Sequence, residues 1–248
     1  MFNKPNDLPY LRFMRRLHAA VLFDWYLEIG CRTGRSMQSV RGKTIGVDPF
    51  FRIENNVIGQ KSAFMAFQQK SDDFFASNVL KSLGIKLSFS FLDGMHLMEY
   101  LLRDFMNAEA NSRDGAVIAM HDCCPYDHEM TTRDVENAPP RAWTGDVWKL
   151  LPILQQYRPD LVITVLGCQP TGLVLISNLD PQNRVLRDNY DDIVAAWKDL
   201  TLADYGVAKF YDSFAYTDVK ELFYNRFALF DKVRLDPQDA DMPIFVSP

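Results

Sequence analysis

A glycine-rich turn that follows a short apolar run constrains this chain more than any other stretch. Residues 25–29 are apolar apart from Glu28, and the turn after them carries Gly30 and Gly34. A second apolar run ends at Asp48. Glycines let the backbone approach a ligand where a Cβ would collide, and an acid at a strand end can accept hydrogen bonds from two ribose hydroxyls. The pattern predicts the strand–turn–helix–strand beginning of an open α/β domain that binds a nucleoside-like cofactor.

The Glu-x-Gly-x-x-x-Gly spacing of this turn resembles motif I of the class I S-adenosylmethionine (SAM)-dependent methyltransferases. It fits the dinucleotide fingerprint Gly-x-Gly-x-x-Gly less well, because position 32 is Arg and no third glycine follows. Glu28 has two alternative roles, which are to orient the turn or to reach the methionine amino group of the cofactor. The resemblance implies that four residues bind SAM, namely Glu28, Gly30, Gly34 and Asp48.

Apolar segments of strand length alternate with helical periodicities along the chain, as is typical of an open α/β sheet. The predicted strands cover residues 25–30, 44–48, 55–59, 85–92, 116–120, 161–166 and 173–176. The predicted helices cover residues 11–23, 35–40, 95–108 and 191–200, with a further helix between 148 and 158. We therefore expect the Rossmann-like, seven-stranded class I methyltransferase sheet, an α/β fold with helices on both faces.

The predicted elements divide the chain of 248 residues into three parts. Residues 1–24 form an N-terminal helical lead-in, and residues 25–180 form the SAM-binding methyltransferase domain. Residues 181–248 form an aromatic-rich C-terminal extension that packs on the core. The alternatives for the extension are a cap over the active site and a subunit contact, so a homodimer is one expectation.

Composition excludes several kinds of partner. A net charge of −5 argues against a nucleic-acid binder that relies on neutralising phosphates. No segment approaches the ~20 apolar residues that span a bilayer, and residues 1–9 lack the apolar core of a signal peptide. The four cysteines have neither zinc-site nor secreted-disulfide spacing. We therefore expect a cytoplasmic protein with reduced thiols and no nucleic-acid or membrane partner.

Ser71, Asp72 and Asp73 open a predicted helix, and two interpretations fit them. Ser71 as N-cap with acids in the first turn would stabilise the helix start. Alternatively, Ser71 or Asp72 lies beside the adenine of the cofactor, because the loop after the third strand supplies that contact in this fold. On the second interpretation, Ser71 and Asp72 are cofactor-binding residues.

Acids and an imidazole follow the later strands. Asp93 follows the fourth predicted strand, and His121 with Asp122 follows the fifth. We expect them to converge, because ligands gather at the carboxyl ends of parallel strands. Such donors suit Mg²⁺, Mn²⁺ or Ca²⁺, and His96, one helical turn beyond Asp93, is the candidate general base. The alternative needs no metal: Asp93 caps the next helix, and His121 simply pairs with Asp122.

Two sequence blocks around these residues resemble one branch of the class I methyltransferases. They are Phe-Leu-Asp-Gly-Met-His at 91–96, followed by Glu-Tyr, and Gly-Ala-Val-Ile-Ala-Met-His-Asp at 115–122. The branch is similar to metal-dependent macrolide-sugar O-methyltransferases and to cephalosporin-biosynthesis methyltransferase-like proteins. This chain departs from it in the Glu-Tyr order and in having His before Asp where some relatives have two acids. The resemblance implies a Mg²⁺ held by Asp93, His121 and Asp122, with His96 as the base.

We therefore expect a SAM-dependent methyltransferase that O-methylates a small-molecule hydroxyl, such as that of a sugar or a natural product. The alternatives are N-methylation, a nicotinamide-dependent oxidoreductase, and a non-catalytic methyltransferase-like subunit. Residues 123–143 lack periodicity, which is typical of a functional or mobile loop. Arg141, Trp143 and Asp146 would line the acceptor pocket, or else they begin a helix in which Trp148 is buried.

Overall fold

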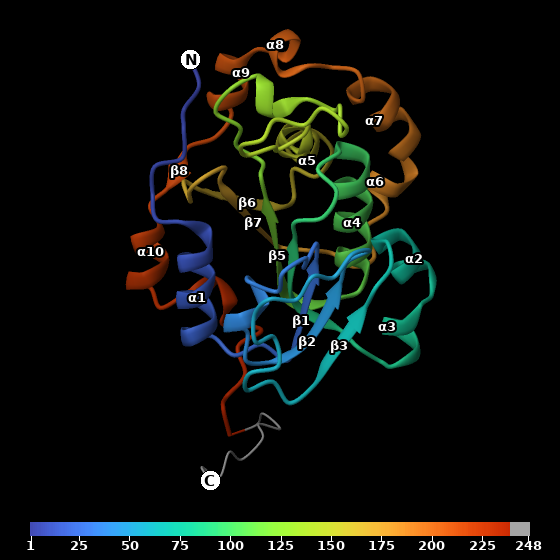
Figure 1. Ribbon diagram of the computed structural model, residues 1–248, viewed down its shortest axis with the longest axis vertical. Coiled ribbons are helices and arrows are strands. Elements are labelled where there is room, and N and C mark those ends of the chain that lie inside the picture. Colours follow the sequence, from blue (N-terminus) through green and yellow to red (C-terminus); the bar gives the residue numbers. More distant parts are fainter. Residues whose placement is uncertain (239–248) are drawn as a thin grey trace.

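A single mixed sheet runs through the computed structural model, which describes residues 1–238 (Figure 1). Its strand order is β3-β2-β1-β4-β5-β7-β6-β8. Only β7 runs antiparallel to its neighbours. The strands are β1 (Trp25–Ile29), β2 (Lys43–Val47), β3 (Phe64–Phe67), β4 (Leu87–Leu92), β5 (Ser112–His121), β6 (Val162–Leu166), β7 (Leu173–Ser177) and β8 (Tyr216–Thr217). The predicted Rossmann-like α/β fold is confirmed, and the two-residue β8 adds an eighth strand to the seven expected.

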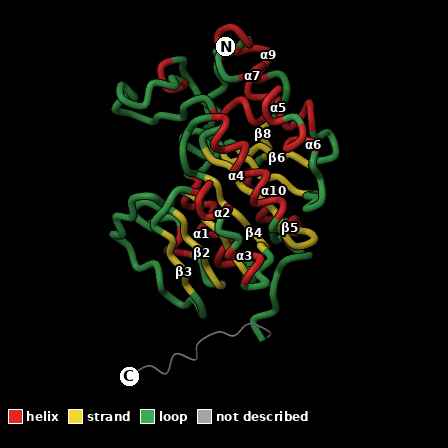
Figure 2. Tube along the Cα trace, turned by 90° about the vertical axis from the view of Figure 1, so that its right-hand side faces the viewer, coloured by secondary structure: helices red, strands yellow, loops and turns green. Residues whose placement is uncertain are grey.

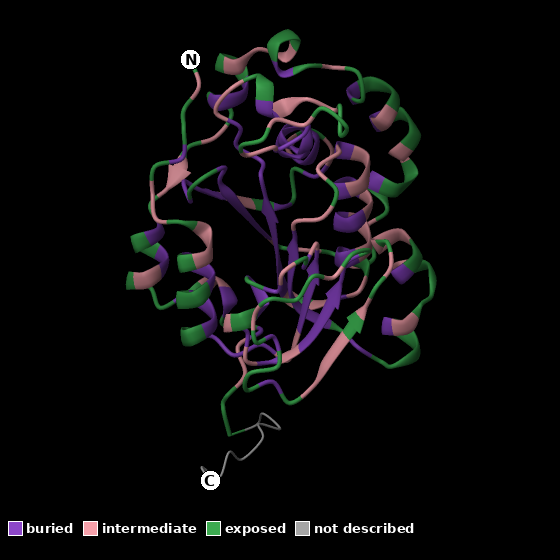
Figure 3. Ribbon diagram, in the orientation of Figure 1, coloured by how far each residue is buried: buried purple, intermediate pink, exposed green. Residues whose placement is uncertain are grey.

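Helices surround the strands of the sheet (Figure 2). Each face of the sheet has its own hydrophobic core. Alternate side chains of β1 show the division, because Tyr26 belongs to the core under α1 (Tyr10–Ala20) and Leu27 to the core under α4 (Met98–Ala110). The strand β4 is buried along its whole length, and so are the first four residues of β7 (Figure 3). Burial on both faces explains why these strands read as nearly continuous apolar runs.

The remaining helices are short. They are α2 (Ser71–Ala76), α3 (Val79–Ser82), α5 (Leu150–Tyr157), α6 (Val185–Asp188), α7 (Tyr190–Trp197), α8 (Leu202–Tyr205), α9 (Val207–Tyr211) and α10 (Val219–Tyr224). Residues from α7 and α9 join the core under α4, and residues from α10 join the core under α1. The described part of the predicted extension therefore packs on both faces of the sheet; residues 239–248 lie outside the described part. None of the described helices combines the length and the apolar character needed to cross a membrane.

Two predicted elements are wrong. The strand expected at 55–59 does not form, because Val57 packs against Gly34 and Ile58 is exposed to solvent. The strand β3 comes later, at Phe64–Phe67, where it pairs with β2. The helix expected at 35–40 is a single 3₁₀ turn, Met37–Ser39. The chain leaves it at Val40 in an extended conformation and enters β2 three residues later.

Gly30 is predicted to tolerate no side chain. A Cβ built there would lie 2.0 Å from the Asp93 carbonyl oxygen, and the φ of Gly30 is +86°. Gly30→Ala should cost about 1–2 kcal/mol in backbone strain and a further ~1–3 kcal/mol in displaced backbone. Gly84→Ala is the matched control, since Gly84 has a φ of +65° and open space around it. Urea unfolding measures both, and equal losses would contradict the prediction.

Candidate active site

The carboxyl ends of four adjacent parallel strands meet at one edge of the sheet. β2, β1, β4 and β5 are consecutive in the sheet order, and the predicted site residues follow directly after them. Backbone bonds tie these ends together: the Gly30 N–H donates to the Val47 carbonyl at 2.9 Å, and the Asp93 N–H donates to the Ile29 carbonyl at 2.9 Å. Strand pairing therefore brings the glycine turn against the loop that carries Asp93.

The two glycines of the turn are packed against the chain itself. At Gly30 the neighbour is the Asp93 carbonyl, and at Gly34, with φ +75°, a Cβ would lie 2.3 Å from a methyl carbon of Val57. Arg32, between them, also has a positive φ of 35°. The sequence pattern predicts that these glycines let the backbone approach a ligand closely. The structure adds a second reason for them, which is that the turn has no room for side chains on its protein side.

Asp48 joins the end of β2 to the turn. Its Oδ2 accepts a hydrogen bond from the Arg32 N–H at 2.8 Å, and its Oδ1 accepts one from the Phe50 N–H at 2.7 Å. The residue is buried. An ionised carboxylate has about four acceptor positions, so each oxygen keeps acceptor capacity beyond these two bonds. Asp48 thus fixes the turn and can still accept further donors.

Glu28 is enclosed beneath the turn. Its Oε1 accepts from the Ser36 hydroxyl at 2.5 Å, and its Oε2 accepts from the Tyr26 hydroxyl at 2.5 Å. Burial raises the pKa of Glu28 to about 8, although both hydroxyl donors oppose this shift. The geometry matches the first of its two alternative roles, because the carboxyl group holds Ser36, which lies just beyond the turn.

Ser71 and Asp72 lie at the start of α2 and face α4. The helix has Lys70 as its N-cap and no side-chain capping bond, so the N-cap interpretation of Ser71 is wrong. Asp72 forms two hydrogen bonds with Arg103 of α4, both 2.8 Å. The Ser71 hydroxyl bonds the buried Asp104, whose pKa burial raises to about 7 against the opposing effect of that bond. Asp72 is therefore engaged in an ion pair in this structure.

The four residues predicted at the later strand ends come together in one acid–imidazole cluster. His121 Nδ1 lies 3.2 Å from Asp93 Oδ1 and 3.4 Å from Asp122 Oδ2. His96 Nε2 lies 3.6 Å from Asp93 Oδ1 and 3.3 Å from Asp122 Oδ2. Among the described residues, the three whose ligand atoms lie within 4.8 Å of one another are Asp93, His96 and Asp122. This group contains His96, whereas the metal ligands predicted from the sequence were Asp93, Asp122 and His121.

Charge within the cluster is balanced. Burial lowers the pKa of each imidazole, but the carboxylates of Asp122 and Asp93 outweigh it and raise the pKa to about 9 at His96 and about 10 at His121. Burial likewise raises the pKa of Asp93, yet the two imidazoles hold it below its usual range. Two carboxylates therefore face two positive charges. A divalent cation carries the same charge as the two protons, so the donor set fits such an ion.

Neighbouring groups fix the orientation of the cluster. His96 Nδ1 lies 2.7 Å from the Trp143 carbonyl oxygen, which leaves Nε2 facing the acids. The Thr171 hydroxyl donates to Asp122, and Asp122 itself has a φ of +61°. Thr171 was not anticipated from the sequence, because it lies in the connection between β6 and β7, which carries no motif.

The segment 123–146 is anchored behind His96 by buried charges. Asp146 Oδ1 accepts from the Met98 N–H at 2.7 Å, and Lys149 Nζ lies 2.7 Å from Asp146 Oδ2. Arg133 bonds Glu99 at 2.7 and 3.1 Å and also pairs with Asp146. Asp146 is therefore a buried anchor for the start of α4, and Trp148 is buried as well. Arg133 was not anticipated from the sequence, since nothing near it in the chain marks it.

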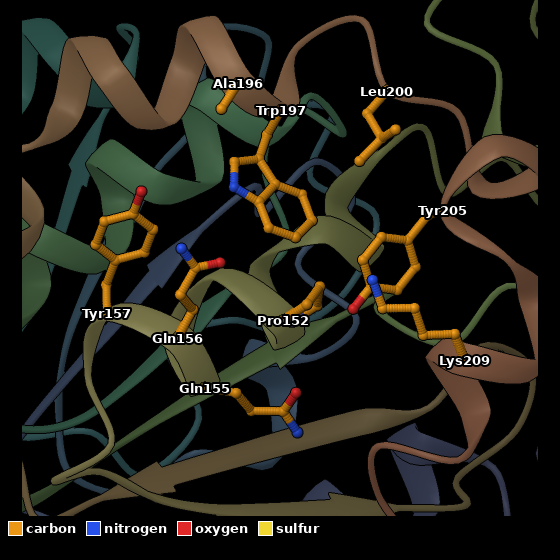
Figure 4. A pocket seen from close by; sticks show the side chains of 9 residues that line it. All are labelled: Pro152, Gln155, Gln156, Tyr157, Ala196, Trp197, Leu200, Tyr205 and Lys209. Carbon is orange, nitrogen blue, oxygen red and sulfur yellow. The ribbon is translucent and has the colours of Figure 1, made fainter.

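A cavity of about 620 Å³ lies away from these strand ends. It is lined by residues of α5, α7, α8 and α9 and by Leu200 (Figure 4). Aromatic side chains line much of it, including Tyr157, Trp197 and Tyr205. None of the predicted site residues contributes to it. The titratable groups and the strand-end geometry, rather than cavity size, therefore identify the candidate site.

Protein-family models give no match, and neither do curated protein sequences. Cofactor-bound Rv0187 from MTB is similar in structure, with a TM-score of 0.52 and 16% identity over 70% of this chain and 80% of that one. The O-methyltransferase from Bacillus cereus in complex with SAH gives 0.48 and 14% over 69% and 79%. The MycE methyltransferase in complex with Mg, SAH and mycinamycin VI gives 0.46 and 15% over 70% and 49%. At these identities the likeness to Rv0187 shows a shared fold, and that fold is the α/β architecture described above.

Proposed function

We propose that this protein is a SAM-dependent methyltransferase that transfers a methyl group to a hydroxyl of a small molecule, such as a sugar or a natural product. One observation carries the proposal. At a single sheet edge, a glycine turn closed by Asp48 lies against a cluster that combines Asp93 and Asp122 with two imidazoles. A nucleoside-binding half and a proton-handling half are thereby adjacent. The shared fold with Rv0187, whose structure is cofactor-bound, supports a fold that can hold a cofactor.

On the donor side, the residues of the turn would hold the cofactor. Asp48 has the acceptor capacity to take hydrogen bonds from two ribose hydroxyls, and its two backbone bonds hold it in place for that role. Glu28 would act indirectly, by keeping Ser36 and the turn in position. Ser71 and Asp72 would border the adenine, with Asp72 oriented by Arg103. Gly30 and Gly34 would keep this wall free of side chains.

On the acceptor side, Asp93, Asp122 and His121 would hold a divalent ion such as Mg²⁺ or Mn²⁺, and His96 would stay uncoordinated as the base. Such an ion, when bound, lowers the pKa of a hydroxyl that it coordinates. His96 can take a proton at Nε2 only while its imidazole is neutral, and the Trp143 carbonyl fixes the tautomer in which Nδ1 carries the hydrogen. The acceptor oxygen then forms its bond to the methyl carbon as the bond from sulfur breaks. The hydroxyl proton goes to His96, and S-adenosylhomocysteine leaves.

Position accounts for most of the rate in such a transfer, because alignment of two bound reactants can supply ~7–11 kcal/mol of the barrier. The structure offers rigid supports for this alignment, since the acids lie at the ends of buried strands.

We also propose that the protein is cytoplasmic. The four cysteines are buried free thiols, as is typical of a reducing compartment. Assembly as a homodimer stays a prediction.

Replacement of Asp93 and of Asp48 by alanine should affect different quantities, namely methyl transfer and the affinity for SAM. Asp93→Ala is expected to abolish methyl transfer while the Kd for SAM stays within a few fold, because Asp93 belongs to the acceptor side. Asp48→Ala is expected to raise the Kd for SAM at least ~10-fold. Calorimetry with SAM and a methyl-transfer assay on a panel of hydroxyl compounds measure both. If SAM binding collapses in Asp93→Ala, Asp93 belongs to the donor site instead.

Removal of divalent cations should reduce methyl transfer at least ~10-fold, and added Mg²⁺ or Mn²⁺ should restore it. The measurement is activity before and after EDTA, with SAM affinity followed in parallel. SAM affinity should not change, because the turn that binds the donor does not include the cluster. Full activity in EDTA would rule out metal assistance and would favour N-methylation or a base-only mechanism.

His96→Gln is expected to lower kcat by ~10²–10⁴-fold, the usual contribution of a general base, with little change in SAM affinity. The matched control is His128→Gln, which removes an exposed imidazole outside the cluster and should leave kcat unchanged. Steady-state kinetics on a compound that the wild-type protein methylates gives the comparison. A wild-type kcat in His96→Gln would exclude His96 as the base.

A further inference from the structure

The first residue of α1, Tyr10, reaches the acid–imidazole cluster from a distant part of the sequence. The chain just before it is bonded to the connection between β6 and β7. The Asp7 N–H donates to the Gly167 carbonyl at 2.8 Å, and the Tyr10 N–H donates to the Gln169 carbonyl at 3.0 Å. The Gln169 N–H donates back to the Leu8 carbonyl at 3.2 Å. Tyr10 is therefore held in place by main-chain bonds on its N-terminal side and by the helix on the other.

The ring of Tyr10 lies over the imidazole of His121. Their centroids are 3.9 Å apart and their planes are inclined by 36°. Phe91 flanks both rings, with centroids 6.1 Å from Tyr10 and 6.3 Å from His121. At 3.9 Å the two rings are in van der Waals contact, so Tyr10 restricts how far the imidazole can tilt.

The two ring nitrogens of the same imidazole make its polar contacts within the cluster. His121 Nδ1 faces Asp93 and Asp122 at 3.2 and 3.4 Å, and Nε2 lies 3.5 Å from the Thr171 hydroxyl. A rotation of the ring would break the contacts to both acids together. The contact with Tyr10 is thus a restraint on the face of the imidazole, and it comes from α1.

The Tyr10 hydroxyl belongs to the same environment. Burial, followed by the carboxylates of Asp93, Asp122 and Glu28, raises the pKa of Tyr10 well above its usual value, and Arg35 opposes this. The phenol therefore stays neutral.

We propose that Tyr10 is a positioning residue, whose ring holds the His121 imidazole with Nδ1 turned toward Asp93 and Asp122. The contact itself is independent of the reaction that the site performs. Its catalytic consequence rests on the proposed methyltransferase function. The ring is the essential part, so phenylalanine should replace Tyr10 and a non-aromatic residue of similar size should not.

A spectroscopic test addresses the contact directly. The chain has four histidines, so their imidazole C–H signals in NMR spectra can be assigned with single His→Gln variants. The ring current of Tyr10 should shift the His121 signals upfield. Tyr10→Leu should remove that shift, and Tyr10→Phe should keep it. Phe13→Leu is the control from the same helix, because the fully buried Phe13 packs on Phe223 and Phe227; it should lower Tm without moving the His121 signals.

A second measurement addresses the consequence for the site. Tyr10→Leu should weaken Mn²⁺ binding, measured by calorimetry on the folded protein, about tenfold, as losses of a ligand-orienting group do. It should lower kcat by a similar factor with SAM affinity unchanged, and Tyr10→Phe should stay within about twofold of the wild type in each quantity.

The proposal is overturned if Tyr10→Leu leaves the His121 signals and Mn²⁺ affinity unchanged, or if Tyr10→Phe is as impaired as Tyr10→Leu. It is also overturned if Phe13→Leu moves the His121 signals as far, since the effect would then be general to α1. A wild-type protein that neither binds SAM nor transfers methyl groups would refute the proposed function alone, because the NMR comparison needs no turnover.

Discussion

The approach of β1 to β4 at their carboxyl ends is the contact on which the rest of the site depends. Gly30 meets the Asp93 carbonyl with no room for a side chain between them, and the Asp93 N–H donates to the Ile29 carbonyl at the end of β1. This contact joins a turn suited to a nucleoside with a loop that carries a carboxylate. It also explains why the first glycine of the turn is required before any ligand is considered, because the fold itself uses its lack of a Cβ.

Buried carboxyl groups lie on both sides of that contact, and each side gives them different polar partners. Buried carboxyl groups need donors or counter-charges, and the molecule supplies hydroxyls to Glu28 on one side and imidazoles to Asp93 and Asp122 on the other. Burial raises the pKa of Glu28 to about 8 against the effect of both hydroxyls, so Glu28 has a structural role in holding the turn. The imidazoles hold the pKa of Asp93 below its usual range, so this carboxylate is available for chemistry.

Much of this arrangement could be predicted from the sequence, because the strands are buried on both faces and their ends carry the acids. The cluster of Asp93, His121 and Asp122 could be predicted from the sequence, because the carboxyl ends of adjacent parallel strands lie at the same edge of the sheet. The roles of Tyr10 and Arg133 were not predicted, because the contacts of each join segments that are far apart in the chain. Arg133 also lies in the segment 123–143, which has no periodicity. The misplaced third strand has a local cause: Val57 looks like a strand residue but packs on the turn.

The short strand β8 has a consequence for behaviour in concentrated solution. It pairs with the last two residues of β6, Val165 and Leu166, and the Tyr216 hydroxyl bonds the Asn3 carbonyl at 2.8 Å. Without it, β6 would present these two residues as an open strand edge, the kind of surface on which chains recruit one another into aggregates. Pairing with β8 therefore prevents another molecule from adding a strand to β6 at Val165 and Leu166.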